Sequence, residues 1–364
     1  MRKGLFTHKL FAVILAGGKG ERFWPLSRVS SPKQLIPIVG KKSLLEQTIA
    51  RITPLVPPER ILVITSRLLE REVAKRLVAF RGIKVVGEPI GKNTAPAIGL
   101  ASRLVSMTEP GATTLVLPSD HIVESKRDFL SDVKTAVRAA QSGKLVVFGI
   151  CPDRPETGYG YMRSGKRLTS LGTGVFEVER FIEKPDHETA VKLLRSRRHF
   201  WNSGMFVWRV DALLGGIRKH IPSLANLIDE FSSRPGERSF SRSLKRFYSS
   251  AEAVSIDYGL LEKSKSILMV RASFEWDDLG SWTSLERVLR KDRHGNVLSG
   301  ETVQVDTRNC VLFSGSGIIA TLGVENLIVV RTEGATLVCD KKKAQNIKRI
   351  SELLSSSAKL KRHL

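Results

Sequence analysis

The stretch Phe11-Ala-Val-Ile-Leu-Ala16, followed directly by Gly17-Gly18-Lys19-Gly20-Glu21-Arg22, decides the fold of this chain. The first part is a short apolar run with β-branched residues at its centre, which predicts a buried strand. The glycines that end the run let the backbone turn tightly and point its N–H groups at an anion. The stretch therefore predicts a strand that leads into a phosphate-binding turn.

The spacing of Gly17, Gly18 and Gly20 matches neither the phosphate loop of nucleoside triphosphatases nor the dinucleotide-binding fingerprint. A glycine-rich turn alone is also a weak indication of function, because tight turns after strands need glycine in any case. The turn by itself leaves a structural role and a phosphate-binding role equally open.

Strands and helices alternate from this turn to about residue 150. Further short apolar runs predict strands at 61–65, 84–86, 113–118 and 145–149. The segments between them predict helices at 43–52, 68–80, 96–107 and 129–142. This alternation predicts an α/β fold of the Rossmann-like kind, with a doubly wound, mainly parallel sheet and helices on both faces.

The character of the sequence changes after residue 150 and again after residue 290. Glycine-rich and aromatic stretches come first, and strand-like pieces follow at 302–305, 310–313, 317–320, 327–330 and 336–339. Turn residues at intervals of about 7 to 10 positions predict a small all-β appendage of the left-handed β-helix kind, with a basic terminal helix. We therefore predict a catalytic domain at 1–290 and a β appendage at 291–364 that serves packing or subunit contact.

The net charge of +23 is the unusual bulk property of the chain. The cations are spread along the sequence, apart from short clusters such as 341–343 and 359–362, and no nucleic-acid recognition motif accompanies them. We interpret the charge as a solvated basic surface that also attracts anionic substrates, and we expect no nucleic-acid partner. A polyanion-binding module is the alternative that the charge leaves open.

The three cysteines, Cys151, Cys310 and Cys339, are odd in number and far apart, which favours a reducing compartment. The apolar run near the start is short and leads into the glycine turn, so removal as a signal peptide would destroy that turn. No stretch approaches the roughly 18 apolar residues of a membrane span. We therefore expect a cytoplasmic protein without a membrane partner.

The residues after the glycine turn extend it to a long signature, Phe23-Trp24-Pro25-Leu26-Ser27-Arg28 and then Ser31-Pro32-Lys33-Gln34-Leu35. Residues 13–35 together resemble the signature of the sugar-phosphate nucleotidyltransferases, and the Phe-Trp-Pro-Leu-Ser and Pro-Lys-Gln versions resemble the mannose-1-phosphate guanylyltransferase branch. Segments similar to the family follow in order at 87–97, 117–121, 157–161, 181–185, 201–206, 255–259 and 276–282.

The resemblance implies a nucleotidyltransferase domain of the GT-A-like kind. It also implies attack by a sugar 1-phosphate on the α-phosphorus of a nucleoside triphosphate, with release of pyrophosphate. The branch implies GTP and mannose 1-phosphate as substrates and GDP-mannose as product. Two alternatives stay open: transfer to glucose 1-phosphate from UTP, dTTP or ATP, and a non-catalytic relative that binds sugar nucleotide without making it.

The resemblance also implies three groups of site residues. The catalytic group is Arg22 for the β- and γ-phosphates, Lys33 near the α-phosphate, and Asp120 and Asp278 on one Mg²⁺. The nucleotide group is Leu15, Ala16, Gly17, Gly18, Lys19 and Gly20 along the phosphates, with Glu88, Asn93, Thr94 and Ala95 at the base. The sugar-phosphate group is Gly158, Tyr159, Glu183, Lys184 and Asn202.

Elementary chemistry supports the metal assignment. Magnesium takes carboxylate and phosphate oxygens, and Asp120 directly follows an apolar strand, where open α/β sheets place their ligand crevice. Helix capping is the alternative role for Asp120, and Asp277 is either an outer neighbour of the metal or solvated. No covalent intermediate is expected, so His121 receives no nucleophilic role.

Only about 80 residues follow the Asp278 motif, which is too few for the β appendage and an additional isomerase domain. We therefore expect transferase activity alone, and the β appendage leads us to expect a homodimer.

Overall fold

The computed structural model describes residues 9–18 and 20–364, which form two compact units. Unit 1 holds the described residues up to Gly17, then 49–118 and 123–275. Unit 2 holds 18–48, 119–122 and 276–364. The units are therefore built from interleaved segments, and the division of the chain at residues 290 and 291 stays a prediction.

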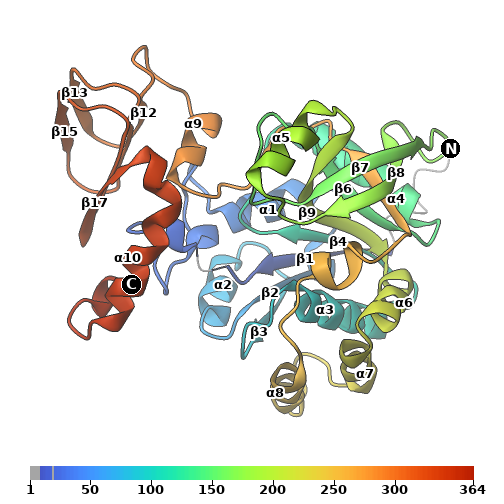
Figure 1. Ribbon diagram of the computed structural model, residues 1–364. Coiled ribbons are helices and arrows are strands. Elements are labelled where there is room, and N and C mark those ends of the chain that lie inside the picture. The colour runs from blue at the N-terminus through green and yellow to red at the C-terminus, as the bar shows by residue number, and fades with distance from the viewer. Residues whose placement is uncertain (1–8, 19) are drawn as a thin grey trace. The chain divides into compact units, whose positions relative to one another are not determined.

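A nine-stranded sheet forms the centre of the described part of unit 1 (Figure 1), in the order β3-β2-β1-β4-β9-β6-β10-β8-β7. β1 lies between β2 and β4 and is parallel to both, with Val13 opposite Leu62 on one side and Val116 on the other. The bounds of the nine strands are β1 Leu10–Ala16, β2 Ile61–Ser66, β3 Lys84–Glu88, β4 Thr113–Pro118, β6 Leu145–Ile150, β7 Tyr161–Arg167, β8 Val175–Ile182, β9 His199–Arg209 and β10 Ile267–Arg271.

The predicted α/β sheet is confirmed, and its second half is more antiparallel than the alternation of elements suggests. β9 lies between β4 and β6 and is antiparallel to both, while β8 is antiparallel to β10 and to β7. The aromatic stretch 201–208 belongs to β9, where Trp201, Met205 and Trp208 are buried. A strand that is buried on both faces loses the alternation of polar and apolar residues, which hides it in the sequence.

Helices cover both faces of this sheet. α3, α6 and α7 pack together on one face, over Val147 and Trp208 (Figure 1). α4 lies on the other face, where Phe129 contacts Phe274, which contacts Phe148. The helices are α1 Leu44–Ile52, α2 Glu70–Arg76, α3 Thr94–Thr108, α4 Lys126–Ala140, α5 His187–Arg195, α6 Val210–His220, α7 Pro222–Glu230, α8 Phe240–Ser250, α9 Leu285–Val288 and α10 Lys348–Ser356.

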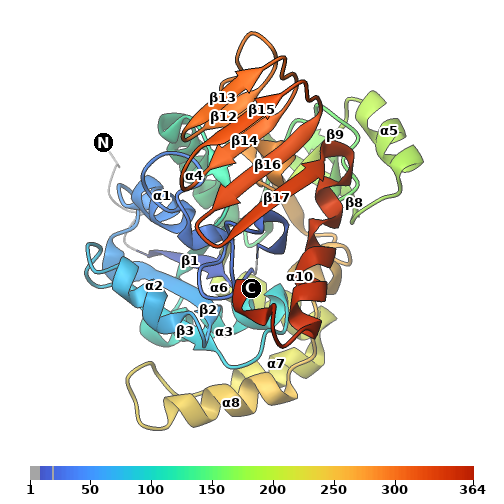
Figure 2. The same cartoon turned by 90° about the vertical axis from the view of Figure 1, so that its left-hand side faces the viewer.

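The C-terminal part of unit 2 is β-helix-like, as expected, and Figure 2 shows its strands side by side. β12, β14 and β16 form one parallel row, and β13 and β15 form a second parallel row. Because successive strands alternate between the rows, the chain coils from one row to the other. The strands are β12 Val297–Ser299, β13 Thr302–Val305, β14 Val311–Ser314, β15 Ile319–Leu322, β16 Leu327–Thr332 and β17 Ala335–Asp340.

Short elements complete the described residues. Two-residue strands are β5 Ile122–Val123 and β11 Trp276–Asp277. Short 3-10 or π helices are η1 Glu21–Phe23, η2 Lys33–Leu35, η3 Pro58–Arg60, η4 Asp257–Leu261, η5 Trp282–Ser284, η6 Lys341–Ile347 and η7 Lys361–His363. Among the described residues, no helix is both long enough and apolar enough to cross a membrane.

The signature loop, residues 18–48, shares one hydrophobic core with the C-terminal strands of unit 2. The Phe23 and Trp282 rings lie 5.0 Å apart between centroids, and the Trp282 and Phe313 rings lie 5.2 Å apart. The Trp282 indole N–H donates to the carbonyl of Trp24 at 3.1 Å. The β appendage therefore holds the signature loop in place.

We expect Trp282→Ala to destabilise unit 2, because Trp282 is fully buried between Phe23 and Phe313. Truncation of a buried tryptophan costs about 3–5 kcal/mol. Chemical denaturation followed by circular dichroism measures the loss. Leu353→Ala is the control, since Leu353 is 70% exposed in the same unit and its truncation should change stability by less than about 0.5 kcal/mol.

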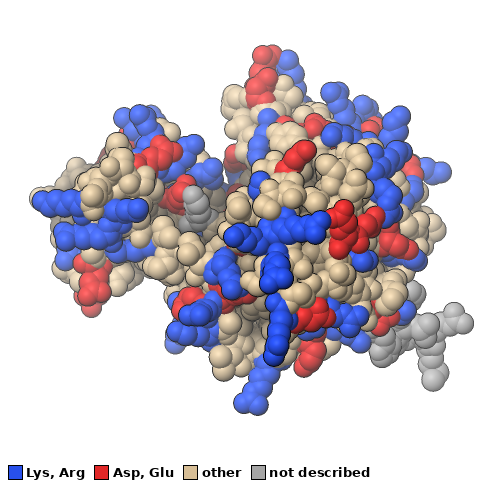
Figure 3. Space-filling model, turned by 90° about the horizontal axis from the view of Figure 1, so that it is seen from below, with Lys and Arg blue, Asp and Glu red and all other residues tan. Residues whose placement is uncertain are grey.

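Basic and acidic side chains are mixed on one face of the molecule. On the face shown in Figure 3, Lys and Arg side chains lie over much of the surface, with Asp and Glu side chains among them. On this face, the mixture of both signs is typical of a solvated surface.

Candidate functional site

A cavity of about 440 Å³ in unit 2 collects residues that are far apart in the sequence. Its wall includes all four predicted catalytic residues, although they come from the signature segment, from the end of β4 and from the turn after β11. The lining residues are Gly20, Glu21, Arg22, Phe23, Lys33, Asp120, His121, Asp278, Leu279, Gly280 and Lys348.

Lys33 is the central cation of this cavity. Its side chain is 6% exposed, and its ammonium forms an ion pair with Asp120 Oδ2 at 2.7 Å. The same ammonium donates to the carbonyls of Asp278 at 2.8 Å and Leu279 at 3.0 Å. An ammonium has three donors, so Lys33 joins Asp120 to the 278–279 turn with all of them.

The surroundings of Asp120 favour its ionised form. Burial opposes its ionisation, but the charges of Lys33 and His121 and the hydrogen bond from Lys33 outweigh that cost, so the pKa of Asp120 lies below its ordinary value. An ionised carboxylate on the wall of a cavity can bind a cation.

His121 is held as a neutral neighbour. Its Nδ1 accepts the indole N–H of Trp276 at 3.1 Å, which leaves the ring proton on Nε2. Burial lowers the pKa of His121, and the negative charges of Asp120 and Asp278 only partly oppose this. The contacts give His121 a supporting place beside Asp120.

The turn 277–280 separates two adjacent aspartates into different roles. Asp277 is buried, where it pairs with Arg287 at 2.5 Å and accepts the Leu279 amide at 2.8 Å. Asp278 lies on the cavity wall, and its Oδ1 accepts the Gly280 amide at 3.1 Å. The buried Leu279 has a φ of +47°, a strained conformation for a branched side chain that persists only where surroundings enforce it.

The glycine turn meets the cavity at Gly20, which needs to be glycine for two reasons. Its φ is +65°, and a Cβ there would lie 2.5 Å from Lys33 Cβ and 2.9 Å from Lys33 N. Next to it, the Arg22 guanidinium donates to the Gly280 carbonyl at 3.3 Å. The Gly18 carbonyl accepts from Gln34 at 3.0 Å, whereas Lys19 lies outside the described residues.

The predicted base-reading residue Glu88 lies in unit 1, at the end of β3. A Cβ built on Gly17 would lie 3.4 Å from Glu88 Oε2, so this carboxyl lies beside the start of the glycine turn. Burial raises the pKa of Glu88 to about 7, although the nearby Tyr248 hydroxyl lowers it in part. Glu88 Oε1 has no hydrogen-bond partner among the described residues, so it keeps an unused acceptor position.

The raised pKa means that Glu88, once ionised at alkaline pH, destabilises the fold. The folded state keeps the proton between about pH 4.5 and about pH 7, while the unfolded chain releases it, so stability falls across that window and stays low above it. We expect Glu88→Gln to raise the thermal midpoint at pH 8, by an amount equivalent to about 2 kcal/mol. Scanning calorimetry at pH 4.5 should show little difference, and a lower midpoint for the variant at pH 8 contradicts the assignment.

Asn93, Thr94 and Ala95 are engaged in fixing the start of α3. The Asn93 side chain accepts the Thr94 amide at 2.8 Å, and Asn93 itself has a φ of +68°. The Thr94 hydroxyl accepts the Ile256 amide at 2.9 Å, and the Ala95 amide donates to Val254 at 3.0 Å. Their contact with a base stays a prediction, and their visible role is to anchor the 254–256 segment.

The predicted sugar-phosphate residues Tyr159, Glu183, Lys184 and Asn202 lie close together in unit 1. Asn202 donates to Asp257 Oδ1 at 2.8 Å, and Lys184 lies 3.5 Å from Glu183 Oε1. Burial and the negative charge of Asp257 raise the pKa of Glu183 to about 7, with Lys184 opposing. The Lys184 amide donates to the carbonyl of Tyr159 at 3.2 Å. Amide and carboxyl groups held this closely suit the binding of hydroxyl groups.

Two residues of this cluster are missing from the predicted set. Asp257 contacts Asn202 and influences Glu183, and its signal in the sequence is the family-like segment 255–259. Gly160 is the glycine that lets Glu183 approach, since a Cβ at Gly160 would collide with Glu183 Oε2. The predicted Gly158 has ordinary room for a Cβ, and its amide donates to Glu156 at 3.2 Å.

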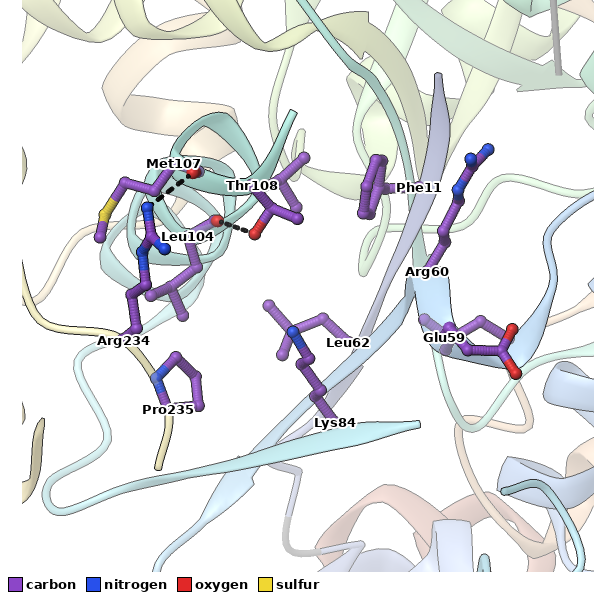
Figure 4. Close-up of a pocket in the computed structure, with 12 residues that line it drawn as sticks. Phe11, Glu59, Arg60, Leu62, Lys84, Leu104, Met107, Thr108, Arg234 and Pro235 are labelled. Atoms are coloured by element: carbon purple, nitrogen blue, oxygen red, sulfur yellow. Dashed lines mark hydrogen bonds between the residues drawn. The ribbon is translucent and has the colours of Figure 1, made fainter. Parts of the chain in front are cut away.

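A second cavity of about 430 Å³ lies in unit 1, where β1, β2 and β3 begin (Figure 4). Phe11, Leu62 and Leu104 supply apolar wall, and Lys84 lies among them. The Arg234 guanidinium turns to the Met107 carbonyl, 3.2 Å away. Of the predicted site residues that the structure describes, none lines this cavity.

Two family models match the chain. Residues 11–295 match the family model described as nucleotidyl transferase, and all of the predicted site residues lie within that range. The chain belongs to the nucleotidyl transferase family. Residues 300–354 of this family member match a second model, described as a MannoseP isomerase/GMP-like beta-helix domain, which covers most of the C-terminal strands and reaches into α10.

Similar proteins cover nearly the whole chain. Xanthan biosynthesis protein XanB from Xanthomonas campestris pv. campestris is 39% identical over 351 residues, which are 95% of this chain and 73% of that protein. Mannose-1-phosphate guanylyltransferase from Klebsiella pneumoniae is 36% identical over 359 residues, 97% of this chain and 76% of that protein. A solved structure from Thermus thermophilus, described as a mannose-1-phosphate geranyltransferase, is 36% identical, with a TM-score of 0.87 and coverage of 95% of this chain and 99% of that one. The chain is therefore a transferase of this family.

Proposed function

We propose that the chain transfers a GMP group from GTP to mannose 1-phosphate, giving GDP-mannose and pyrophosphate. The observation that carries this proposal is the cavity of unit 2, where Lys33 of the family signature meets Asp120 and Asp278. Relatives that match over nearly all of the chain are named for the same reaction. The signature variants at 23–27 and 32–34 support the mannose and guanine choice over glucose 1-phosphate with UTP, dTTP or ATP.

The reaction is an in-line displacement at the α-phosphorus. An oxygen of the sugar phosphate forms a new bond to that phosphorus, and the bond to the oxygen that bridges to the β-phosphate breaks. The electron pair leaves with pyrophosphate, so no covalent enzyme intermediate and no external oxidant or reductant is needed. Two anionic reactants must approach each other, and charge neutralisation and alignment therefore dominate the work of the protein.

Asp120 and Asp278 fit a magnesium ion. Both carboxylates line one cavity, and the described residues offer no cluster of three or more metal-ligating side chains. Magnesium matches such a site, because it takes one or two carboxylates and fills its other positions with phosphate oxygens and water. When bound, the ion supplies charge neutralisation at the phosphates. Lys33 keeps Asp120 ionised and holds the 278–279 turn beside it.

We assign the remaining predicted residues to the two substrates. Arg22 and the glycine turn, with Leu15, Ala16, Gly17, Gly18, Lys19 and Gly20, bind the triphosphate through backbone N–H groups and positive charge. Glu88 accepts hydrogen bonds from the N–H groups of guanine, and Asn93, Thr94 and Ala95 also lie at the base. Glu183, Asn202, Lys184, Tyr159 and Gly158 bind the sugar phosphate, and Asp257 orients Asn202.

We also propose a homodimer that forms through unit 2. Val303 and Val305 project from the same face of β13, and Leu322 lies opposite Val305 on β15. These side chains are 50%, 51% and 72% exposed, which makes an apolar patch that a second copy of the chain can cover. Light scattering should give twice the monomer mass, and Val305→Lys should reduce it.

The three free cysteines support a cytoplasmic location.

Pyrophosphate release tests the proposed reaction. The purified protein is incubated with Mg²⁺ and each pairing of GTP, UTP, dTTP or ATP with mannose 1-phosphate or glucose 1-phosphate. We expect GTP with mannose 1-phosphate to give the highest kcat/KM. Equal rates with all triphosphates would remove the guanine assignment, and absence of release with every pair would favour a non-catalytic binding protein.

Gly160→Ala tests the sugar-phosphate assignment. The new Cβ would displace the Glu183 carboxylate, so the KM for mannose 1-phosphate should rise about tenfold while the KM for GTP stays unchanged. Steady-state kinetics with each substrate varied in turn measures both constants. Gly215→Ala in α6 is the control, because a Cβ there meets nothing within 4 Å. Equal effects on both KM values would contradict a specific role for Glu183.

A further inference from the structure

Lys348 brings a cation from the far end of the chain to the phosphate-binding cavity. It is the first residue of α10, in a part of the sequence that the local pattern assigns only to packing or subunit contact. The structure places it on the wall of the same cavity as Arg22, Lys33 and Asp278. Lys348 and the other residues of the cavity wall all belong to unit 2.

The position of Lys348 is fixed by the packing of η6, the short helix that precedes α10. Ala344 and Ile347 are 3% and 2% exposed and lie in the core that contains Phe23 and Trp24. At the start of η6, the Lys341 ammonium pairs with Glu286 at 2.8 Å. Because Ile347 is buried beside the signature loop, the residue after it is held at the edge of the cavity that the loop forms.

The end of the chain is tied to the same loop. The Trp24 indole N–H donates to the carbonyl of His363 at 3.0 Å, and α10 contacts η1, which contains Arg22. Lys348 therefore stands on a backbone that is anchored before and after it. A flexible surface lysine lacks such anchors.

The charges on the cavity wall show what Lys348 adds. Glu21, Asp120 and Asp278 are acidic and face the cations Arg22, Lys33 and Lys348. Lys33 is already engaged by Asp120 and two carbonyls. Lys348 is exposed to the cavity, and in the described part of the chain no carboxylate forms an ion pair with it. Its charge is available for an anion that enters the cavity.

We propose that Lys348 binds the β- and γ-phosphates of the nucleoside triphosphate and the pyrophosphate that leaves. This inference rests on the proposed function and extends it, because it makes the C-terminal segment part of the catalytic site. An ammonium on an exposed cavity wall forms charge-assisted hydrogen bonds to phosphate oxygens. The sugar phosphate carries a single phosphate, which the residues around Glu183 and Lys184 are assigned to bind. The effect of Lys348 should therefore be confined to the polyphosphate.

Lys348→Met tests the inference. We expect the KM for GTP in the forward reaction and for pyrophosphate in the reverse reaction to rise roughly tenfold, as for loss of one charge-assisted hydrogen bond. The KM for mannose 1-phosphate should stay within about twofold, and Lys348→Arg should restore most of the loss. Lys343→Met is the matched control, since Lys343 is an exposed lysine of η6 outside the cavity wall.

Calorimetric titration of magnesium pyrophosphate into each protein gives a second measurement that needs no turnover. A roughly tenfold weaker binding constant in Lys348→Met, with an unchanged thermal midpoint, supports the inference. Equal binding of pyrophosphate and equal KM for GTP in the variant and the wild type overturn it, while turnover by the wild type leaves the proposed function standing. Failure of the wild type to turn over removes the proposed function, and the titration still decides whether Lys348 binds polyphosphate.

Discussion

Lys33→Met should lower kcat by at least about a hundredfold. The substitution removes a buried cation from the cavity, and electrostatic groups of this kind contribute about a hundred- to a thousandfold to turnover. It also frees the carbonyls of Asp278 and Leu279 and leaves Asp120 without its closest partner. Lys33→Arg should not rescue the activity, because a planar guanidinium cannot donate to the same three acceptors in a closed site.

The measurement is kcat for pyrophosphate release at saturating substrates, together with the thermal midpoint. Lys41→Met is the matched control, since Lys41 is exposed in the same segment and should retain full activity. A variant that stays folded and keeps more than about a third of the wild-type kcat would show that Lys33 is only structural.

Asp120→Asn and Asp278→Asn should each lower kcat by about a hundredfold or more at ordinary magnesium concentrations. Both residues are assigned to one ion, so the double variant should be little worse than the more damaged single variant. Binding of Mn²⁺, followed by electron paramagnetic resonance, should weaken in each single variant. Independent, fully additive losses with unchanged ion binding would show that the two carboxylates do not share a metal.

Asp277→Asn is the control for this pair, because it alters the adjacent aspartate. Asp277 is buried against Arg287, so the change should cost the fold about 3–5 kcal/mol and leave the magnesium dependence of the remaining activity unchanged. The contrast between neighbouring aspartates separates support of the turn from binding of the ion.

The sequence predicts some of these assignments but not others. The family pattern favours Asp278 over Asp277, and the structure places Asp278 on the cavity wall and Asp277 against Arg287. The two carbonyl partners of Lys33 are not predictable, since they lie 245 and 246 residues further along the chain. The sequence also points to Gly158 instead of Gly160, because the crowding that requires glycine comes from Glu183 on another segment.

The sequence by itself determined the features that depend on neighbouring residues. The apolar runs of β1, β2 and β4, the glycine turn and the repeating strands of the C-terminal region are all written in local pattern, because strand burial and tight turns are set within a few residues. Motif order then identified the family, since a signature of this length is read directly from the chain.

Only the tertiary structure decided what depends on distant contacts. It placed β9 between β4 and β6, joined Asp257 to Asn202, and packed the signature loop against the C-terminal core. It also brought Lys348 to the cavity of unit 2, in a segment whose sequence shows only a basic helix. The reason is physical: these contacts are selected by burial and charge complementarity between segments far apart in the chain, and no local pattern records which segments will meet.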